Sequence, residues 1–323
     1  MPSESLKISI VIPIFNEEAL LAELISRVTV TMSTLSDVEK LDTELVLVND
    51  GSRDSSLNML REAAAKDPRI VVVDLSRNFG HQSAIQAGLE CASGDAIVLM
   101  DGDLQDPPEL LPQLVKEWQA GSKVVIAKRK SRAERGFKRF LFDSFYKVLG
   151  RLSDFPIELN AGHFSLIDKR AVHDLLTLPE RNRFLPGLRS WVGYKQTFIY
   201  YDREERAAGA PKMTTLKLLK YGFDAIFSFS YKPLRAIWSF GFIVSMLCIL
   251  YALFLITLRI LNINVIPGFT TPTVAILFVG GVQLISVGIL GEYLGRIYDE
   301  VKQRPLYIIN EVIRSTQDSE EHA

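Results

Sequence analysis

Two long apolar runs near the carboxyl end constrain the architecture of this 323-residue chain more than any other feature. Residues 236–258 and 265–291 carry no charged side chain, and Pro267 and Pro272 interrupt the second run. Each run is long enough to cross a hydrocarbon layer of about 30 Å at about 1.5 Å per helical residue. We therefore expect transmembrane helices at 236–261 and 268–292, since a helix buried in a soluble core is usually shorter.

Basic residues flank the two runs unevenly, and this asymmetry predicts an orientation. Arg259 is the one basic residue between the runs. The basic residues nearest the outer ends are Lys217, Lys220, Lys232, Arg235, Arg296, Lys302 and Arg304. The positive-inside rule places both flanks in the cytoplasm. We expect a multi-pass protein of the inner (cytoplasmic) membrane whose large domain and tail are cytoplasmic.

Residues 213–235 mix Leu, Tyr and Phe with Lys at helical spacing. This mixture predicts interfacial amphipathic helices, with an ordinary amphipathic packing helix as the alternative. The expected organisation is a cytoplasmic domain at 1–212, interfacial helices at 213–235, membrane helices at 236–261 and 268–292, and a cytoplasmic tail at 293–323.

The first hundred residues alternate short β-branched runs with helical stretches. Strands are expected at 8–14, 44–48, 70–75 and 96–100, with helices near 17–34, 53–66 and 80–92. This is the βαβ rhythm of a mostly parallel sheet, so the predicted fold class is α/β. Ligands of such sheets bind beyond the carboxyl ends of the strands, which makes the polar residues after each strand the first site candidates.

An acidic pair follows the fourth predicted strand. Asp101, Gly102 and Asp103 come directly after it, and Pro107 and Pro108 stop regular structure soon afterwards. Two carboxylates at i and i+2 can share one divalent cation, and a hard ion such as Mg²⁺ or Mn²⁺ then neutralises a diphosphate. The same tripeptide also occurs by chance in acidic loops, but its position at a strand end favours the metal interpretation.

Polar turns also follow the first two strands. Asp50 could accept hydrogen bonds from a base or a ribose. The alternative is a plain turn at Gly51 with Asp54 as a helix cap, which leaves Asp50 without a role. Asn16, after the first strand, could be an ordinary helix N-cap.

The charge balance gives no support to a nucleic-acid partner, because the formal net charge is -1 and phosphate-backbone binding normally needs a large basic excess. Positive charge is instead concentrated in one cluster, Lys128, Arg129, Lys130, Arg132 and Arg135. Such a cluster suits a lipid phosphate and an anionic membrane surface, with a solvated basic loop as the alternative.

Taken together, the three loops resemble the family 2 glycosyltransferases of the GT-A fold. That family ends its first strand in Pro-x-Phe/Tyr-Asn-Glu, as at residues 13–17, and its second in Val-x-Asp-Gly-Ser-x-Asp, as at 48–54. Segments 101–108, 182–193, 206–212 and 291–305 look like the polyprenyl-phosphate branch, which includes dolichyl-phosphate mannose synthases and bactoprenol glucosyltransferases. The resemblance covers nearly all of residues 7–310.

The resemblance implies a role for each matching residue. The nucleotide sugar would be bound by Pro13, Phe15, Glu17, Val48, Asp50, Asp101 and Gly102. The metal ion and the diphosphate would be held by Asp101, Asp103 and Gln105. By resemblance, phosphate groups of donor or acceptor would be contacted by Arg129, Arg206 and Lys212, and the basic cluster adds Arg132 and Arg135 to this set. The catalytic residues would be Asp103 and Arg206, with His163 included because it stands where many relatives have a carboxylate.

One position departs from the family pattern. Where many relatives have Ala-Gly-Asp-Phe, this chain has Ala161-Gly162-His163-Phe164, so a carboxylate is missing. A phosphate monoester with a second pKa near 6 is largely dianionic at neutral pH and has less need of a general base than a hydroxyl has. His163 is either a neighbour of that phosphate or a structural loop residue.

The expected reaction is inverting transfer of a hexose, preferably glucose from UDP-glucose, to polyprenyl (undecaprenyl) phosphate. GDP-mannose or a UDP-amino sugar is an alternative donor. A processive polysaccharide synthase is disfavoured because residues 187–191 lack the Gln-x-x-Arg-Trp pattern, and a non-catalytic membrane scaffold is disfavoured by the intact acidic motifs. Two short membrane helices bury little against each other, so we also expect a homo-oligomer.

Overall fold

The computed structural model describes residues 5–129, 161–181, 183–201, 232–261 and 270–315. The chain divides into two compact units. The first comprises Met1–Lys147, Phe155–Thr214 and Arg304–Ala323, and the second comprises Val148–Asp154 and Thr215–Gln303.

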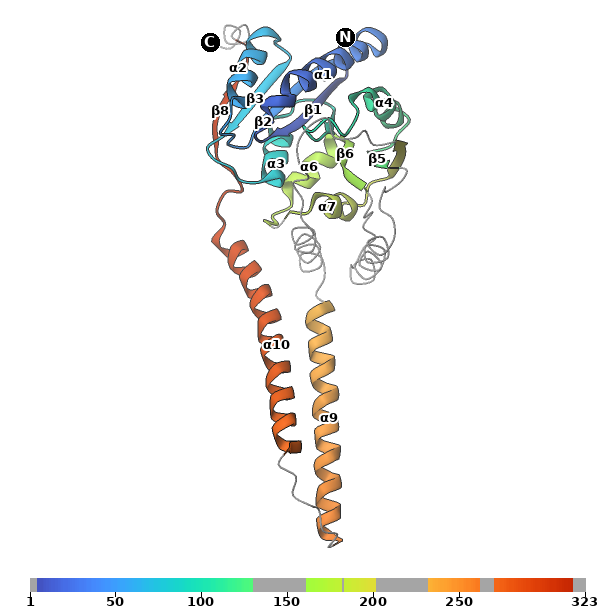
Figure 1. Cartoon of the computed structure of the whole chain (residues 1–323). Helices are drawn as coiled ribbons and strands as arrows, with labels where there is room; N and C mark the ends of the chain where they lie inside the picture. Colours follow the sequence, from blue (N-terminus) through green and yellow to red (C-terminus); the bar gives the residue numbers. More distant parts are fainter. Residues whose placement is uncertain (1–4, 130–160, 182, 202–231, 262–269, 316–323) are drawn as a thin grey trace. The chain divides into compact units, whose positions relative to one another are not determined.

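In the described part of the chain, the first unit is built on an eight-stranded sheet with the order β7-β5-β6-β4-β1-β2-β3-β8 (Figure 1). The strands are β1 Lys7–Ile14, β2 Asp42–Asn49, β3 Ile70–Leu75, β4 Ala96–Leu99, β5 Val124–Arg129, β6 Ala161–Asp168, β7 Gln196–Tyr201 and β8 Ile309–Ile313. Neighbours β4, β1, β2 and β3 run parallel, as do β5 and β7. Strand β6 is antiparallel to β4 and β5, and β8 is antiparallel to β3.

Helices cover both faces of this sheet. They are α1 Glu18–Glu39, α2 Ser56–Lys66, α3 His81–Cys91, η1 Pro108–Leu110, α4 Leu111–Gln119, α6 Lys169–Thr177 and α7 Leu185–Trp191. The predicted α/β class is therefore confirmed. The four expected strands lie within two residues of β1 to β4, whereas α1 continues five residues beyond the expected end at 34.

Side-chain alternation along β1 shows how both faces are buried. Ile8, Ile10 and Ile12 join the core cluster that contains residues of α1, α2 and α4. Val11 points to the other face, where a Cβ added to Gly88 of α3 would lie 2.2 Å from its Cγ1. A strand buried on both faces needs a continuous apolar run, which explains the sequence of β1.

The amino edge of the sheet carries a buried carboxylate with a full set of partners. Glu44 is 6% exposed. Its oxygens accept hydrogen bonds from Ser9 Oγ at 2.6 Å and from Ser93 N at 3.0 Å, and Lys7 Nζ lies 3.4 Å away. Burial alone would raise the pKa of Glu44, but these partners hold it below its ordinary value.

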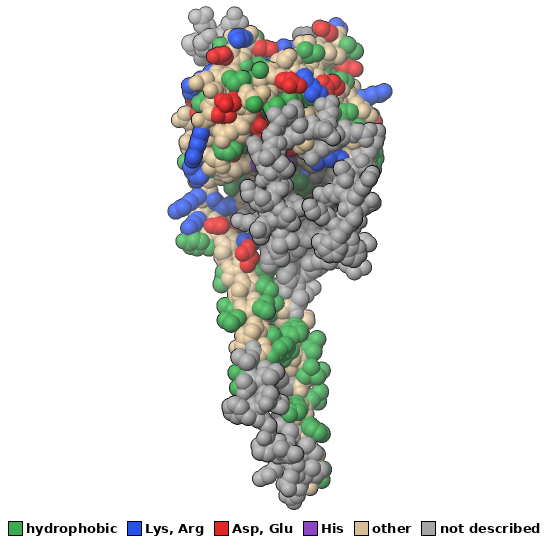
Figure 2. Space-filling model, in the orientation of Figure 1, with side chains coloured by type: hydrophobic (Ala, Val, Ile, Leu, Met, Phe, Trp, Pro, Cys, Tyr) green, Lys and Arg blue, Asp and Glu red, His purple; other side chains and the backbone are tan. Residues whose placement is uncertain are grey.

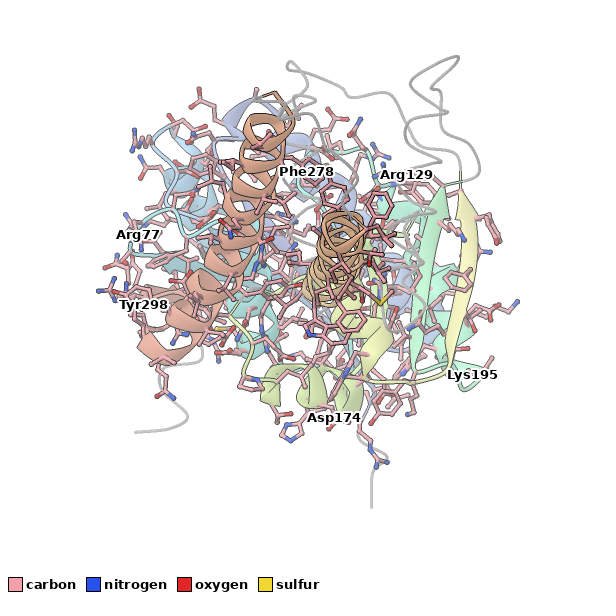
Figure 3. All side chains as sticks on the ribbon, turned by 90° about the horizontal axis from the view of Figure 1, so that it is seen from below. Arg77, Arg129, Asp174, Lys195, Phe278 and Tyr298 are labelled. Atoms are coloured by element: carbon pink, nitrogen blue, oxygen red, sulfur yellow. The ribbon has the colours of Figure 1, made fainter. Side chains whose placement is uncertain are left out.

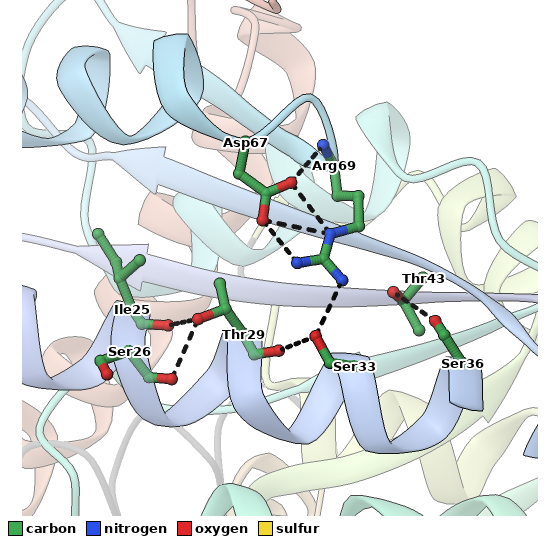
Figure 4. Close-up of polar contacts among 8 residues, drawn as sticks. All are labelled: Ile25, Ser26, Thr29, Ser33, Ser36, Thr43, Asp67 and Arg69. Carbon is green, nitrogen blue, oxygen red and sulfur yellow. Dashed lines mark hydrogen bonds and ion pairs between the residues drawn. The ribbon is translucent and has the colours of Figure 1, made fainter. Parts of the chain in front are cut away.

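A second polar network ties α1 to the turn before β3 (Figure 4). Arg69 donates from Nε and Nη2 to Asp67, at 3.0 and 2.7 Å, and from Nη1 to Ser33 Oγ at 3.4 Å. Ser33 Oγ in turn donates to the carbonyl of Thr29 at 3.0 Å. These contacts fix a helix against the sheet away from the strand ends that carry the acidic motifs.

The second unit consists of two long helices in its described part, α9 Lys232–Ile260 and α10 Thr270–Lys302. Hydrophobic side chains are exposed along them (Figure 2), including Phe242 at 59% and Leu284 at 76%. Among the described residues, the segment Phe278–Lys302 is long and apolar enough to cross a membrane, and Ile237–Tyr251 is a shorter apolar segment. Helices form at both predicted positions, although α10 continues ten residues beyond the expected end at 292, and a membrane crossing by either helix remains a prediction.

The residues after α10 return to the sheet of the first unit. Strand β8 pairs with β3, Ser76 N donates to the Ile308 carbonyl at 2.9 Å, and Asn310 Nδ2 donates to Asp74 Oδ2 at 2.9 Å. The expected tail at 293–323 thus contains the end of α10 and an edge strand. The polar end of the tail lies outside the described residues.

Candidate active site

The loop after β4 brings the acidic pair to the carboxyl edge of the sheet. A Cβ added to Gly102 would lie 2.9 Å from Ile14 Cδ1 and 3.2 Å from the Pro13 carbonyl, so glycine lets the loop lie against the end of β1. Gln105 N donates to Asp103 Oδ1 at 3.3 Å, and Leu104 adopts a left-handed φ of 58°. The turn places the carboxylates of the motif beside the first strand, as the sequence predicts for parallel strand ends.

Asp101 offers a buried oxygen that lacks a hydrogen bond. Its Oδ1 has no hydrogen-bond partner among the described residues, and His81 Nε2 lies 3.4 Å from it. The rings of His81 and His163 meet edge to face at a centroid distance of 4.8 Å. Within the described part of the chain, the Nδ1 atom of His163 is also buried without a hydrogen-bond partner, and its Nε2 lies 3.4 Å from Gln82 Nε2. Orphaned buried polar atoms are uncommon in folded proteins and mark this corner as a candidate ligand site.

The surroundings of His163 favour the neutral imidazole. Burial lowers the pKa of His163 to about 4, and the nearby guanidinium groups of Arg189 and Arg129 act in the same direction, against the opposing charge of Asp101. His163 lies on β6 near Asp101 rather than in a loop, and its interpretation as a neighbour of the lipid phosphate stays a prediction.

Arg189 is a buried cation that the sequence analysis missed. It lies on α7, is 1% exposed, and donates from Nη1 to Ser165 Oγ at 2.8 Å. Ser165 Oγ donates to the His163 carbonyl at 2.9 Å, so the guanidinium supports the strand that carries His163. Burial lowers the pKa of Arg189 to about 10, which leaves it charged at neutral pH. Arg189 lies within the segment 182–193 that carries the family resemblance, but nothing in the local sequence pattern indicates that its side chain is buried.

Asp50 fastens the loop that follows β3. Its carboxylate accepts hydrogen bonds from Phe79 N at 2.7 Å, from Gly80 N at 3.1 Å and from Asn78 Nδ2 at 3.0 Å. Burial raises the pKa of Asp50, and the two backbone bonds partly offset that rise. Gly51 has φ 64°, and a Cβ there would lie 2.4 Å from the Asn78 nitrogen, so glycine is required. Contact between Asp50 and a nucleoside stays a prediction.

The other predicted nucleoside residues differ in accessibility. Phe15 is 37% exposed, and Pro13 and Glu17 are partly exposed, at the end of β1. Asn16 joins this loop to the next, because its Oδ1 accepts from Arg53 N at 2.8 Å. Val48 is fully buried and faces Gly88 of α3, so its side chain is able to shape a nucleoside pocket only indirectly.

One residue of the predicted phosphate-binding set lies in the described part of the chain. Arg129 ends β5, on the opposite side of the carboxyl edge from Arg77 (Figure 3). Its side chain is 30% exposed. The remaining members lie outside the described residues: Arg132, Arg135, Arg206 and Lys212.

The donor set fits a divalent cation held jointly with a substrate. Among the described residues, no group of three or more His, Cys, Asp or Glu side chains is arranged to hold a metal ion. Mg²⁺ usually binds through one or two carboxylates plus substrate phosphates and water, rather than through a cage of protein ligands. The orphaned Oδ1 of Asp101, with Asp103 two residues away, meets that requirement.

Comparison with known proteins identifies the class. The model of glycosyl transferase family 2 matches residues 9–176. The chain belongs to this family, which confirms the resemblance inferred from the three loops, and it is a glycosyltransferase.

Two relatives match along almost the whole chain. The SfII prophage-derived bactoprenol glucosyl transferase of Shigella flexneri is 42% identical over 306 residues, which cover 94% of this chain and 97% of that protein. An uncharacterized glycosyltransferase of Synechocystis sp. is 46% identical over 311 residues, or 95% and 96% of the two chains. A weaker match is glucosyl-3-phosphoglycerate synthase from Mycobacterium tuberculosis in complex with Mn²⁺, uridine-diphosphate and phosphoglyceric acid, with 21% identity, 68% and 75% coverage and a TM-score of 0.41.

Proposed function

We propose that this protein transfers a hexose from a nucleotide sugar to polyprenyl phosphate at the cytoplasmic face of a membrane, giving a lipid-linked sugar for the cell envelope. The observation that carries the proposal is the extent of the match to a bactoprenol glucosyl transferase, which takes in 94% of the chain. That span includes long helices with exposed apolar side chains as well as the acidic loop. A transferase with a lipid acceptor needs both parts.

UDP-glucose is the proposed donor, since the relative named above is a glucosyl transferase. GDP-mannose and UDP-amino sugars are the alternatives. The nucleoside would lie against the loops that end β1 and β2, where Phe15 is accessible and Asp50 fixes the neighbouring loop.

The proposed chemistry is direct displacement at the anomeric carbon. An oxygen of the lipid phosphate forms the new bond to that carbon, the bond to the diphosphate oxygen breaks, and the electron pair leaves with the nucleoside diphosphate, so the anomeric configuration inverts. The phosphate is largely dianionic at neutral pH and needs no proton removed. His163, which is partly buried and has a lowered pKa, would border the reacting groups without acting as an obligatory base.

Asp101, Asp103 and Gln105 would hold Mg²⁺ or Mn²⁺ at the diphosphate. When bound, the ion would neutralise charge on the leaving group. Arg129 and Arg206 would orient the lipid phosphate through charge-assisted hydrogen bonds.

The membrane part is proposed to be a two-span hairpin of α9 and α10. Support comes from the length of the helices, 29 and 33 residues, against about 20 needed to span a bilayer. We also propose self-association through this part, to be tested by mass measurement in mild detergent, where a monomer would contradict it.

The test is a transfer assay with the detergent-solubilised full chain. Radiolabelled UDP-glucose, GDP-mannose and UDP-N-acetylglucosamine would each be incubated with Mn²⁺ and a short polyprenyl phosphate, and the lipid product extracted. Label in the lipid from UDP-glucose is the expected result. Label from another donor would change the sugar and keep the reaction class, whereas no lipid product from any nucleotide sugar would overturn the proposal.

A further inference from the structure

Three side chains from three different strand ends meet beside the acidic loop. Asp106 belongs to the loop after β4, Arg129 ends β5 and Tyr201 ends β7. Tyr201 Oη donates to Asp106 Oδ1 at 2.5 Å, Arg129 Nε donates to Tyr201 Oη at 3.4 Å, and Arg129 Nη2 lies 3.9 Å from Asp106 Oδ1. Asp106 lies within the segment 101–108 that carries the family resemblance, but neither Asp106 nor Tyr201 was assigned a role from the sequence.

The three members differ sharply in exposure. Asp106 is 2% and Tyr201 5% exposed, whereas 30% of the Arg129 side chain is accessible. Tyr201 is further held by an edge-to-face contact with Phe164, at a centroid distance of 5.9 Å. Asp106 and Tyr201, both buried, therefore hold one side of the Arg129 guanidinium, while part of the Arg129 side chain stays accessible.

The buried carboxylate is costly unless a cation compensates it. Asp106 is 2% exposed, and the charges of Asp101 and Asp103 lie nearby. A third acidic group beside an acidic pair weakens the fold unless a positive charge or hydrogen bonds compensate it. Arg129 is the positive group that faces it, and the Tyr201 hydroxyl bridges the two.

We propose that Asp106 and Tyr201 are positioning residues that preorganise Arg129 for the phosphate of the lipid acceptor. A free arginine side chain loses about 2 kcal/mol of rotamer entropy when it is fixed, and a guanidinium already held in place avoids part of that loss on binding. The Nη2 to Asp106 distance of 3.9 Å exceeds a hydrogen bond, so the carboxylate orients the guanidinium without binding it in a fork. The guanidinium therefore stays able to receive a phosphate.

This inference rests on the proposed function, and its test compares Tyr201→Phe with the matched control Tyr200→Phe. Tyr200 is the preceding residue of β7 and is 56% exposed, so it points away from the network. In the detergent-solubilised full chain, Tyr201→Phe should raise the KM for polyprenyl phosphate about five- to tenfold, the size of one lost hydrogen bond to a charged network. The KM for the nucleotide sugar should stay as in the wild type, and the Tm should fall only by the small amount that one lost buried hydrogen bond costs. Tyr200→Phe should change none of these values.

A double-mutant cycle with Arg129→Ala decides whether Tyr201 acts through the guanidinium. Once Arg129 is removed, Tyr201→Phe should add nothing further to the KM for polyprenyl phosphate, because coupled residues are not additive. Asp106→Asn should show the same dependence on Arg129. Additive effects, or equal losses for donor and acceptor with a lowered Tm, would overturn the inference. A wild-type enzyme that transfers no sugar to polyprenyl phosphate would instead overturn the proposed function.

Discussion

The two edges of one sheet treat buried charge in opposite ways. At the amino edge, Glu44 is buried and its oxygens are occupied by Ser9, Ser93 and Lys7. At the carboxyl edge, Asp101 Oδ1 and His163 Nδ1 are buried with no hydrogen-bond partner among the described residues. The same strands form both edges, so the difference in hydrogen-bond partners comes from what packs around each strand end.

We interpret the contrast as a division of roles, in which Glu44 stabilises the fold and Asp101 is available to bind a ligand. A buried carboxylate with every acceptor site used contributes to stability and has little capacity left for binding. A buried carboxylate oxygen without a hydrogen-bond partner costs free energy, and a bound cation recovers that cost. Substitutions at the two edges should accordingly change different measurements.

The largest expected effect is on activity at the carboxyl edge. Asp103→Ala should lower transfer by about 1000-fold or more, because the diphosphate charge loses several kcal/mol of compensation in the transition state. The measurement is turnover at saturating donor and Mn²⁺, with Tm as the check on folding. Asp37→Ala, at an exposed position of α1, is the control. Turnover like that of the wild type in Asp103→Ala would remove the basis for the metal site.

The next effect is on stability at the amino edge. Glu44→Ala leaves the Ser9 hydroxyl, the Ser93 amide and Lys7 without their acceptor, which should cost about 3 kcal/mol and lower the Tm by roughly 5–10 °C. The KM for the nucleotide sugar should not change. Glu39→Ala, exposed at the end of α1, serves as the matched control. A large rise in donor KM with an unchanged Tm would contradict the division between the two edges.

A smaller effect is expected at His163. His163→Ala should retain transfer within about tenfold of the wild type, because the dianionic phosphate is its own nucleophile. His163→Asp, which restores the family carboxylate, should not be required for turnover. Both variants would be assayed with saturating donor, beside His173→Ala, whose side chain is exposed on α6. An inactive His163→Ala enzyme, or a wild type that works only after His163→Asp, would show that residue 163 is chemically essential.

The smallest effect concerns pH. The pKa of Glu44 is lower in the folded protein than its ordinary value, despite burial, because of its hydrogen bonds and Lys7. Its stabilising contribution is therefore complete above the unfolded-state pKa of about 4.3 and is lost as the pH falls through the folded-state pKa. The Tm difference between wild type and Glu44→Gln should shrink between pH 6 and pH 3. A difference that is constant or grows toward acid pH would contradict the assignment.

Much of the site could be predicted from the chain because parallel strands bring their carboxyl ends together. Pro13 lies at the end of β1, Asp50 and Asp101 follow β2 and β4, and these three strands are neighbours in the sheet. Strands β5, β6, β7 and β8 escaped prediction, since short strands far apart in sequence show no local sign of the partner they pair with. Arg189 and Tyr201 escaped for a related reason, because burial of a polar side chain depends on what packs around it.

The sequence by itself determined the family, the α/β class, the two apolar helices and the acidic pair, because these depend on periodicity, apolar length and the spacing of adjacent residues. Only the tertiary structure decided which charges are paired. Glu44 and Asp101 are acidic residues at opposite edges of the same sheet. The Glu44 carboxylate is surrounded by hydrogen-bond donors, whereas Asp101 Oδ1 has no hydrogen-bond partner among the described residues. Likewise, Asp106, Arg129 and Tyr201 come together only when three strand ends meet, and no spacing along the chain encodes that contact.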